Sequence, residues 1–322
     1  MARVCTELFP KGYYKGQKDH GFYMDDVLKA NLDVLLKNAS KKDDWDFVII
    51  ISGGGRVRIG KSMLALQIAQ YWIYMLSKLY DIKTPFNIDE NIVFHGKDLI
   101  EKGHEIYKKY SQGVIIFDEA GADLEGLKVI RKTTQAVKDY LRECGQYNFL
   151  TILVLPEFFD LPRGIAITRS DCLIDIYRSV NNEGKFIRGF FNFYSWPNKR
   201  ELYLRGKKEL NYKAWKYDFH GRFTKFYPID EEKYRAAKLK ALLSRKKEEE
   251  EKKDHRWKIQ RDLIWKIILQ NNLTTQGELV EFYKKCGINI DQTTISFAIL
   301  NKNLPEIPPS AIPTRIRAQK IL

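Results

Sequence analysis

The stretch GRVRIGKS, residues 55–62, fits the pattern G-x-x-x-x-G-K-S/T and constrains the fold more than any other feature of the sequence. The apolar run DFVIII (46–51) precedes it, and SMLALQIAQYWIYML (62–76) follows it as a helical pattern. This order of strand, loop and helix points backbone N–H groups and a helix N-terminus at a phosphate. Gly55 and Gly60 permit backbone conformations and a close approach that a Cβ atom would obstruct. The pattern therefore predicts a nucleotide-binding loop.

The residues of this loop have distinct expected roles. Lys61 would reach the β- and γ-phosphates, and the Ser62 hydroxyl would hold Mg²⁺. A glycine-rich turn without a ligand is the alternative, but the flanking strand and helix favour phosphate binding. We therefore expect ATP and Mg²⁺ as cofactors and Lys61 as a catalytic residue. The residues expected to contact the nucleotide are Gly55, Arg58, Ile59, Gly60, Lys61 and Ser62.

A second acidic motif completes the expected site. In GVIIFDEAG (113–121), four apolar residues run into Asp118 and Glu119, where a buried strand should end. Ligands bind at the carboxyl ends of strands in parallel sheets. Asp118 suits Mg²⁺ coordination, directly or through water, and Glu119 is placed to polarise an attacking water as general base. A simple turn or helix cap is the alternative interpretation of such a pair.

Short apolar runs alternate with helical patterns up to about residue 228, which predicts an α/β fold. Runs of β-forming residues without polar alternation suit strands buried on both faces of a parallel sheet. The segment 186–205 is predicted as a hairpin with a Pro-Asn turn, and NIVFH (91–95) as one more strand. The predicted strands are 46–51, 113–118, 149–155 and 172–177, and the predicted helices are 61–79, 97–110 and 128–144.

Composition divides the chain further. We expect an N-terminal extension (1–45), an ATPase domain (46–228), a charged helical linker (229–255) and a small, mainly helical domain (256–322). The net charge of +14 favours an acidic partner such as nucleic acid, although an inert basic surface is the alternative. The four cysteines lie far apart and predict free thiols. Without a membrane-length apolar run or a secretion signal, we expect a cytoplasmic protein.

The two motifs together resemble the P-loop ATPases that carry a glutamate beside the Walker B aspartate. That group includes RecA-like motors, packaging ATPases, helicases and AAA+ proteins. The resemblance implies a parallel sheet with an extra strand between the two Walker strands, and residues 91–95 fall where that strand is expected.

The segment 140–177 narrows the resemblance to the FtsK/HerA branch and to phage and mobile-element ATPases of the zonular occludens toxin-like kind. Glu157 stands where that branch carries a glutamine sensor. The resemblance implies a homo-oligomeric ring with an arginine finger supplied by the neighbouring subunit. Arg163 and Arg169 are the preferred candidates, ahead of Arg131 and Arg142; an exposed or phosphate-contacting basic residue is the alternative for each.

The C-terminal segment resembles the winged helix-turn-helix of arginine-repressor-type proteins. QGELV (276–280) and DQTTISF (291–297) match the starts of its two helices, with Phe297 in place of an arginine. Thr275 and Asp291 are expected N-caps, and Gly287 is expected to end the first helix. Packing against a partner protein is the alternative to DNA binding, and Trp257, Trp265 and Phe282 are expected in the core. The residues expected to contact DNA are Gln292, Thr293, Thr294, Ser296, Arg315 and Arg317.

These features predict an ATP-hydrolysing DNA motor of a phage or mobile element, working as a translocase, packaging or helicase-like ATPase in the cytoplasm, or in the host cytoplasm if viral. DNA, further copies of the chain and other phage or plasmid proteins are the expected partners. The alternative is a nucleotide-gated adaptor or loader that switches oligomeric state and recruits DNA or a partner protein. A phage assembly ATPase acting at a membrane is a third, less favoured hypothesis.

Overall fold

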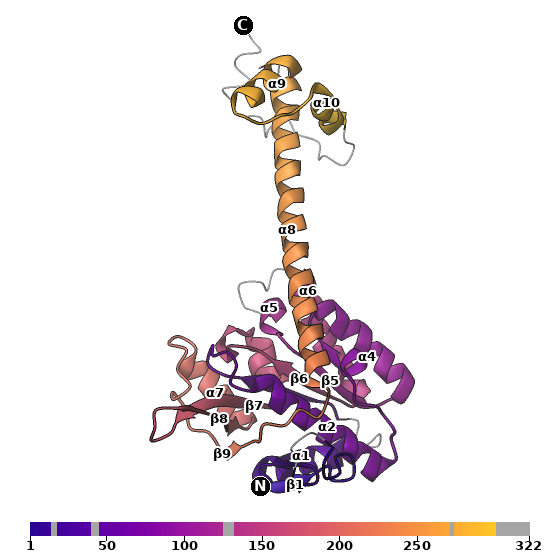
Figure 1. Ribbon diagram of the computed structural model, residues 1–322, viewed down its shortest axis with the longest axis vertical. Helices are drawn as coiled ribbons and strands as arrows, with labels where there is room; N and C mark the ends of the chain where they lie inside the picture. The colour runs from indigo at the N-terminus through magenta and orange to yellow at the C-terminus, as the bar shows by residue number, and fades with distance from the viewer. Residues whose placement is uncertain (14–17, 40–44, 125–131, 271–273, 301–322) are drawn as a thin grey trace. The chain divides into compact units, whose positions relative to one another are not determined.

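The computed structural model divides the chain into two compact units, the first ending at Leu239 and the second beginning at Lys240 (Figure 1). Helix α8 (Glu231–Gln270) contributes its first turns to the first unit and the rest to the second. Within the described ranges, every helix is too short or too polar to span a lipid bilayer. The residues that the structure describes are 1–13, 18–39, 45–124, 132–270 and 274–300.

The first unit is built on a mostly parallel sheet of seven strands in the described residues, in the order β4-β5-β6-β3-β7-β8-β9. The first five strands in that order pair in parallel, and β8 and β9 add an antiparallel edge. The strands are β3 (Phe47–Ser52), β4 (Ile92–Val93), β5 (Gly113–Phe117), β6 (Phe149–Val154), β7 (Cys172–Val180), β8 (Phe186–Tyr194) and β9 (Phe219–Arg222).

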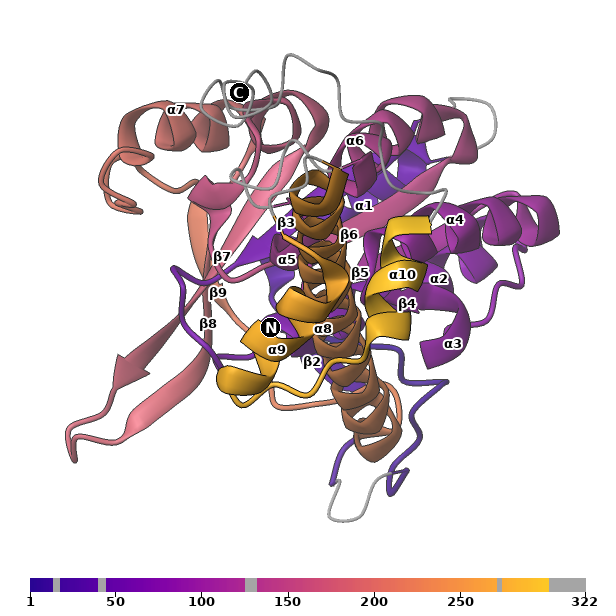
Figure 2. The ribbon, with the colours of Figure 1, turned by 90° about the horizontal axis from the view of Figure 1, so that it is seen from above.

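Helices and short turns connect these strands and flank the sheet (Figure 2). The 3₁₀ turns are η2 (Cys144–Tyr147) and η3 (Phe158–Asp160), and η4 (Gly164–Arg169) is a π-helical turn. The helices are α1 (Asp26–Asn38), α2 (Lys61–Tyr80), α3 (Ile88–Asn91), α4 (Gly96–Tyr110), α5 (Gly121–Leu124), α6 (Lys132–Glu143) and α7 (Trp196–Gly206).

The central strands form the core because their side chains are apolar on both faces. Every residue of β3, β5 and β6 is buried, and so is each residue of α2 from Met63 to Ile73. Burial on both faces is what an unbroken apolar run requires. The predicted α/β sheet, its four main strands and two of the helices, α2 and α4, are therefore confirmed to within a few residues.

The predicted strand between the two that carry the motifs is present, but its assignment to residues 91–95 was wrong. The strand between the two that carry the motifs is β6, whose six residues pair with both β3 and β5. The segment 91–95 supplies only the two-residue β4, which lies at the sheet edge beside β5. A long, fully apolar run fills the centre, and a two-residue strand buries too little surface to compete for it.

The expected hairpin within 186–205 is also wrong. Pro197 lies in the first turn of α7, where its fixed φ and missing N–H are tolerated. The hairpin instead joins β7 to β8 through residues 181–185, with Asn181 accepting hydrogen bonds from the backbone N–H groups of Glu183 (3.1 Å) and Lys185 (2.8 Å). Gly184 has a φ of 76°, which this turn requires.

The N-terminal residues pack into the first unit. Strands β1 (Ala2–Val4) and β2 (Phe22–Met24) form a small antiparallel sheet beside α1. Phe9 and Phe22 contact Phe226, with ring centroids 5.0 and 5.1 Å apart. These contacts fix the segment that follows β9, which contributes Lys225 and Tyr227 to the site described below.

The second unit is a small helical domain formed by the rest of α8, α9 (Gln276–Lys285) and α10 (Gln292–Leu300). A capping box of Thr275 and Glu278 starts α9, and Asp291 accepts a 2.6 Å hydrogen bond from the Thr294 N–H, so both predicted N-caps are confirmed. Trp265 is the largest side chain of its core, and its indole donates to the Tyr283 hydroxyl at 3.1 Å. The core residues are Trp265, Leu279, Ile295 and Ala298.

The expectation that three aromatic residues lie in this core holds for Trp265 alone. Trp257 is 70% exposed and Phe282 is 60% exposed. Trp257 lies one helical turn or more before the part of α8 that α9 and α10 cover, so no apolar partner reaches it among the described residues of the core.

We predict that Trp265→Ala destabilises the second unit by about 3–5 kcal/mol, because it removes the largest core side chain and leaves a cavity. Trp257→Ala is the matched control and should change stability by about 0.5 kcal/mol or less. Hydrogen exchange of the α9 and α10 amides measures both effects. Equal protection in the two variants would contradict this assignment of the core.

Candidate functional site

The glycine-rich loop joins β3 to α2 and is held in shape by positive φ angles. Gly54, Gly55, Arg58 and Gly60 have φ values of 52°, 70°, 58° and 106°. At Gly60 a Cβ atom would lie 3.0 Å from the Phe223 ring, so both conformation and space require glycine there. These angles turn the chain so that α2 begins at Lys61 with its N-terminus facing the loop.

Hydrogen bonds anchor the loop at both ends. The Gly55 N–H donates to the carbonyl of Pro156, just beyond β6, at 2.9 Å. The Lys61 ammonium donates to the carbonyl of Arg56 inside the loop. The loop is therefore tied to the neighbouring strand, and Lys61 folds back over it as a phosphate-binding lysine would.

The acidic pair lies at the carboxyl end of β5, next to the start of α2. Ser62 Oγ donates to Asp118 Oδ1 at 3.1 Å, so the hydroxyl and the carboxylate expected to bind Mg²⁺ are adjacent. Asp118 is only 1% exposed, whereas Glu119 is half-buried with a φ of 64°. Backbone bonds to Val93 on one side and Val154 on the other, each 2.9 Å, hold this sharp turn between two strands.

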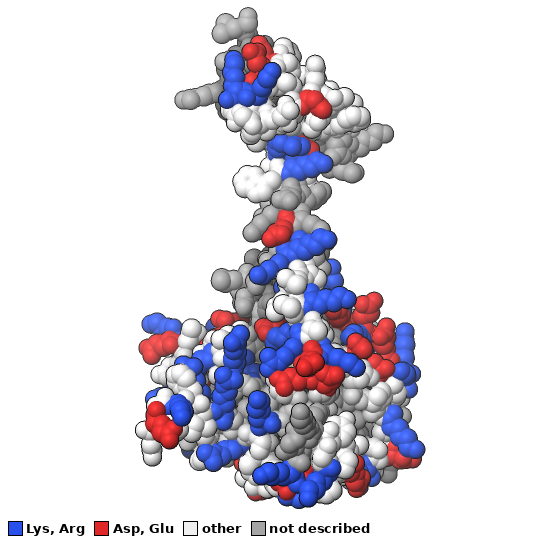
Figure 3. Space-filling model, viewed as in Figure 1, with Lys and Arg blue, Asp and Glu red and all other residues white. Residues whose placement is uncertain are grey.

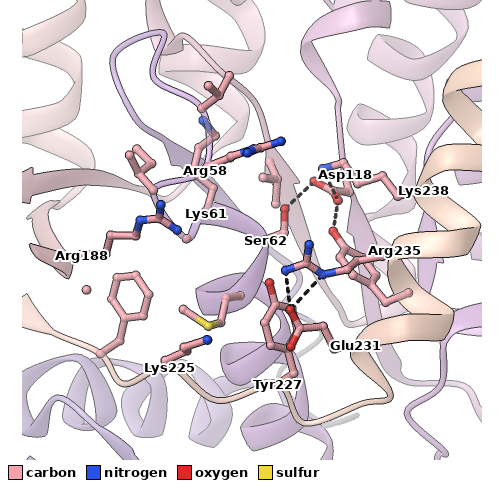
Figure 4. Close-up of a pocket in the computed structure, with 18 of the residues that line it drawn as sticks. Arg58, Lys61, Ser62, Asp118, Arg188, Lys225, Tyr227, Glu231, Arg235 and Lys238 are labelled. Atoms are coloured by element: carbon pink, nitrogen blue, oxygen red, sulfur yellow. Dashed lines mark hydrogen bonds and ion pairs between the residues drawn. The ribbon is translucent and has the colours of Figure 1, made fainter. Parts of the chain in front are cut away.

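Two residues of α8 complete the surroundings of the acidic pair, and the sequence analysis missed both. The Tyr234 hydroxyl donates to Asp118 Oδ2. Lys238 Nζ lies 3.1 Å from Asp118 Oδ2 and 2.7 Å from Glu119 Oε1. Figure 4 shows Lys238 beside Asp118. The sequence does not distinguish them, because they belong to a charged helix whose side chains are all expected to face solvent.

A cavity of about 670 Å³ opens between the loop and the acidic pair. Figure 4 shows Arg58, Lys61 and Arg188 on one side of it and Asp118 and Lys238 on the other. Its lining carries six Lys or Arg side chains against three Asp or Glu, an excess that suits a polyphosphate. The six cations are Arg58, Lys61, Arg188, Lys225, Arg235 and Lys238.

Burial acts in the same direction on the two lysines at the acidic pair, but their net pKa shifts are opposite. Burial lowers the pKa of Lys61, and the nearby carboxylates of Glu119 and Asp118 offset only part of that change. Burial also acts to lower the pKa of Lys238, but its contacts with Asp118 and Glu119 outweigh burial and raise the pKa overall. Lys238 is therefore held as a cation against both carboxylates.

The residues present fit a magnesium ion. The donor set is a hydroxyl and a carboxylate, the oxygen ligands that Mg²⁺ prefers. The Lys238 ammonium already rests on Asp118, which shows that this carboxylate accommodates a positive charge from the cavity. No group of three or more His, Cys, Asp or Glu side chains suited to a metal occurs in the described residues. Ser62 and Asp118 would therefore share the ion with phosphate oxygens and water.

Glu157, the predicted sensor, does not line this cavity. It accepts a 2.6 Å hydrogen bond from the Tyr212 hydroxyl and a 3.2 Å bond from the Phe159 N–H. Burial raises the pKa of Glu157, and burial together with Glu157 raises the pKa of Asp175 to about 8. Neither of these two carboxyl groups lines the cavity between the loop and the acidic pair.

The candidate arginine fingers are in different surroundings. The Arg169 guanidinium forms an ion pair with Asp46 and donates to the Leu141 carbonyl, so it is engaged inside its own unit. Arg163 is exposed just before η4. Arg142 is exposed and lies 3.8 Å from Asp139. Arg131 lies outside the described residues. Arg163 is thus the preferred candidate whose side chain faces solvent.

The predicted DNA-contacting residues of α10 differ in accessibility. Gln292 and Thr293 are exposed. Thr294 is exposed too, but its hydroxyl donates to Asp291 at 2.6 Å. Ser296 turns toward α9 and donates to Gln276 Oε1 at 3.0 Å. The start of α10 therefore offers a polar surface. The predicted contacts Arg315 and Arg317 lie outside the described residues.

Positive and negative side chains are mixed on one face of the first unit. On the face seen in Figure 3, Lys and Arg side chains are interspersed with Asp and Glu. Surface charges of mixed sign largely cancel at a distance. Lys and Arg side chains do gather in the linings of the two largest cavities described.

Residues 253–303 match the family model described as "Arginine repressor, DNA binding domain". The match covers the end of α8 together with α9 and α10, and it supports the resemblance seen in the sequence. It begins close to residue 256, where the sequence analysis placed the start of the small domain. The sequence matches none of the curated proteins.

The structure has remote similarity to several solved proteins. A genome packaging NTPase from Sulfolobus turreted icosahedral virus 2, in complex with AMP, is 15% identical, with 48% of this chain and 94% of that chain covered and a TM-score of 0.33. The DNA-packaging ATPase from Sulfolobus turreted icosahedral virus is 20% identical over 48% and 95%, with a TM-score of 0.32. A KaiC-like protein from Pyrococcus horikoshii is 12% identical over 47% and 78%, with a TM-score of 0.28.

We predict that Asp175 makes the protein less stable as the pH rises. Its folded pKa of about 8 lies above the ordinary value of 3.8, so the folded state keeps a proton that the unfolded state loses. The stabilisation is complete below about pH 4 and is lost as the pH rises to about 8. Asp175→Asn should therefore gain stability relative to the parent across this window, whereas exposed Asp89→Asn should not. A difference in unfolding temperature between the parent and Asp175→Asn that is the same at every pH would contradict this.

Proposed function

We propose that the chain is an ATP-hydrolysing DNA motor, a translocase, packaging or helicase-like ATPase of a phage or mobile element. One observation carries this proposal: Lys61, Ser62, Asp118 and Glu119 converge on a cationic cavity at the carboxyl end of a parallel sheet. The match of residues 253–303 to a DNA-binding domain supports DNA as the partner.

The cavity has several groups suited to the triphosphate of a nucleoside triphosphate. The loop N–H groups and the N-terminus of α2 face the phosphates, and Lys61 neutralises their charge. Arg188 and Lys225 come from β8 and from the segment after β9, so the antiparallel edge of the sheet also contributes cations. When bound at Ser62 and Asp118, Mg²⁺ would neutralise charge on the phosphate oxygens.

In the proposed hydrolysis, Glu119 acts as the general base. As water attacks the terminal phosphorus, a new P–O bond forms, the bond to the bridging oxygen breaks, and Glu119 accepts the proton that water loses. Glu119 is half-buried and directed at the cavity, where Lys238 contacts it at 2.7 Å. Lys238 must release Glu119 for it to act as a base. Arg163 of a neighbouring copy in a ring is proposed to stabilise the transition state, and Arg169 is disfavoured by its ion pair with Asp46.

The second unit is proposed to hold DNA through the start of α10. Gln292 and Thr293 are placed there as an exposed polar surface, as in the recognition helix of a helix-turn-helix. Residues 255–322 carry ten Lys or Arg against five Asp or Glu, a net charge of +5, which suits contact with phosphates.

We predict that Glu119→Gln lowers the rate of ATP hydrolysis about 10²- to 10⁴-fold while ATP still binds, because it removes the base and keeps the shape. Lys61→Ala should lose both hydrolysis and binding. Steady-state phosphate release and binding of a fluorescent ATP analogue, each with and without single- and double-stranded DNA, measure these effects.

Glu101→Gln is the matched control, since Glu101 is exposed on α4 and lines none of the described cavities. It should hydrolyse ATP at the parent rate. Full turnover in Glu119→Gln would show that another group acts as the base. Turnover that is slow in the parent and indifferent to DNA would reject the motor.

A second candidate function, the nucleotide-gated adaptor or loader, is favoured by the contact of Lys238 with the acidic pair. Lys238 and Tyr234 lie on α8, the helix that continues into the second unit. Mg²⁺ at Ser62 and Asp118 would compete with the Lys238 ammonium for the same carboxylate. Nucleotide binding would then displace the start of α8, and the second unit would report the nucleotide state.

We predict that Lys238→Ala lowers the Mg²⁺ concentration needed for half-maximal nucleotide binding about tenfold, since about 1.4 kcal/mol of competition is removed. Lys240→Ala, an exposed change two residues further along α8, is the control and should keep the parent value. Titration of Mg²⁺ against the bound fluorescent analogue measures the difference. An unchanged Mg²⁺ requirement in Lys238→Ala would remove the support for this switch.

A further inference from the structure

The first unit contains a second cavity of about 1090 Å³, which we call the aromatic pocket. It lies between β7, β8 and the segment 210–217. It shares no lining residue with the cavity at Lys61 and Asp118, which we call the nucleotide cavity. We propose that the aromatic pocket binds the bases and phosphates of a single nucleic-acid strand. The inference deepens the proposed DNA motor and rests on it for the identity of the polymer.

The walls of the aromatic pocket are rings suited to stacking. Five of its lining residues are Tyr or Trp; Tyr194 is buried, and the other four, Tyr177, Tyr212, Trp215 and Tyr217, are at least partly exposed. Tyr217 is 44% exposed, and Trp215 is fixed in orientation by a 2.9 Å hydrogen bond from its indole to Asn198. The Arg205 guanidinium lies 4.4 Å from the centre of the Trp215 ring. Ordered, partly exposed rings stack on any base, which is how single strands are bound without sequence preference.

Four cations surround these rings. Arg56, Arg178, Lys213 and Lys216 all line the aromatic pocket, and all four are exposed. Asp175 is the one acidic residue in the described lining. Exposed Lys and Arg beside aromatic faces match a strand whose phosphates lie outside and whose bases turn inward. A peptide with acidic groups alone would leave the rings without a partner.

The floor of the aromatic pocket supplies groups for the edge of a base. Asp175 is 6% exposed, and Asn192 lies opposite it in the register of β7 and β8. Because the pKa of Asp175 is raised to about 8 by burial, its carboxyl is mostly protonated at neutral pH. A protonated carboxyl both donates and accepts, as a carboxamide does, and both groups can pair with base edges. The rings thus match the face of a base, the polar floor its edge, and the cations the phosphates.

The aromatic pocket also touches the glycine-rich loop. Gly53, Gly54 and Arg56 line it, whereas Val57 to Lys61 line the nucleotide cavity. The Tyr212 hydroxyl lies 3.3 Å from Ser52 Oγ at the end of β3. A strand in the aromatic pocket would therefore contact the same loop that holds ATP. A duplex would not enter, since its bases are stacked and paired inside the helix.

The test uses the full chain without nucleotide and a labelled thymidine oligonucleotide of about eight residues, a length within the range for one binding site. Fluorescence anisotropy gives its affinity. Tyr217→Ala should weaken binding about tenfold, whereas Tyr217→Phe, which keeps the ring, should bind as the parent does. Equal affinity of the parent and Tyr217→Ala would overturn the proposal.

The salt dependence separates phosphate contact from a structural effect. Lys213→Ala and Lys216→Ala should each reduce the slope of log affinity against log salt by about 0.7. Lys83→Ala and Lys97→Ala, which are exposed and outside the described cavities, should leave the slope unchanged. Unchanged slopes in both pocket variants would show that the phosphates lie elsewhere.

Two further arms separate this site from the others. Gln292→Ala should weaken duplex binding by the second unit and leave binding of the oligonucleotide intact. Lys61→Ala should abolish ATP hydrolysis, and it too should leave binding of the oligonucleotide intact. If Lys61→Ala and the parent hydrolyse equally, the proposed ATPase fails while the pocket stands. If a duplex or free thymidine monophosphate competes as well as the oligonucleotide, the single-strand pocket is rejected.

Discussion

The buried carboxylate of Asp118 is the constraint on which the rest of the first unit depends. A carboxylate that is 1% exposed must be compensated by hydrogen bonds or by a cation. Ser62 from the start of α2 and Tyr234 and Lys238 from α8 provide that compensation. One side chain thus joins the end of β5, the glycine-rich loop and the first turns of α8. Loss of any one partner would leave charge or polar surface unpaired in a protein interior.

Much of this fold was predictable because its central strands are buried on both faces and therefore appear as unbroken apolar runs. The glycine-rich loop between β3 and α2 and the acidic pair at the end of β5 were placed correctly, because each motif is set by local backbone geometry. Strand order is not local, which is why the place of β6 between β3 and β5 was assigned to residues 91–95. Lys238 was not predicted for the same reason. Its place in the site depends on contact with Asp118, which lies far away in the sequence.

Two of the predicted site residues share one feature, a contact within the first unit that the sequence does not reveal. Arg169 was expected to reach another subunit, but Asp46 binds it within the unit. Glu157 was expected at the nucleotide, but Tyr212 binds it outside the nucleotide cavity. In both cases a charged side chain is partly buried, and the cost of burial is met by one specific contact. Charge and spacing predict that such residues matter, and the tertiary contact decides how.

The glycine-rich loop lines two cavities of different chemistry. In one, cations and an acidic pair suit a triphosphate with Mg²⁺; in the other, rings, cations and a buried carboxyl suit a nucleic-acid strand. The loop is short and is held by the hydrogen bonds of Gly55 to Pro156 and of Lys61 to Arg56, so a shift forced on Gly54 or Arg56 would be passed to Arg58 and Gly60. A nucleic-acid strand that favours one loop conformation would change the affinity of the protein for ATP. Because such coupling is reciprocal, ATP would change the affinity for the strand by the same factor. A DNA motor requires such a coupling between ATP and DNA. Here the proposed sites for both are lined by the same eight-residue loop between β3 and α2.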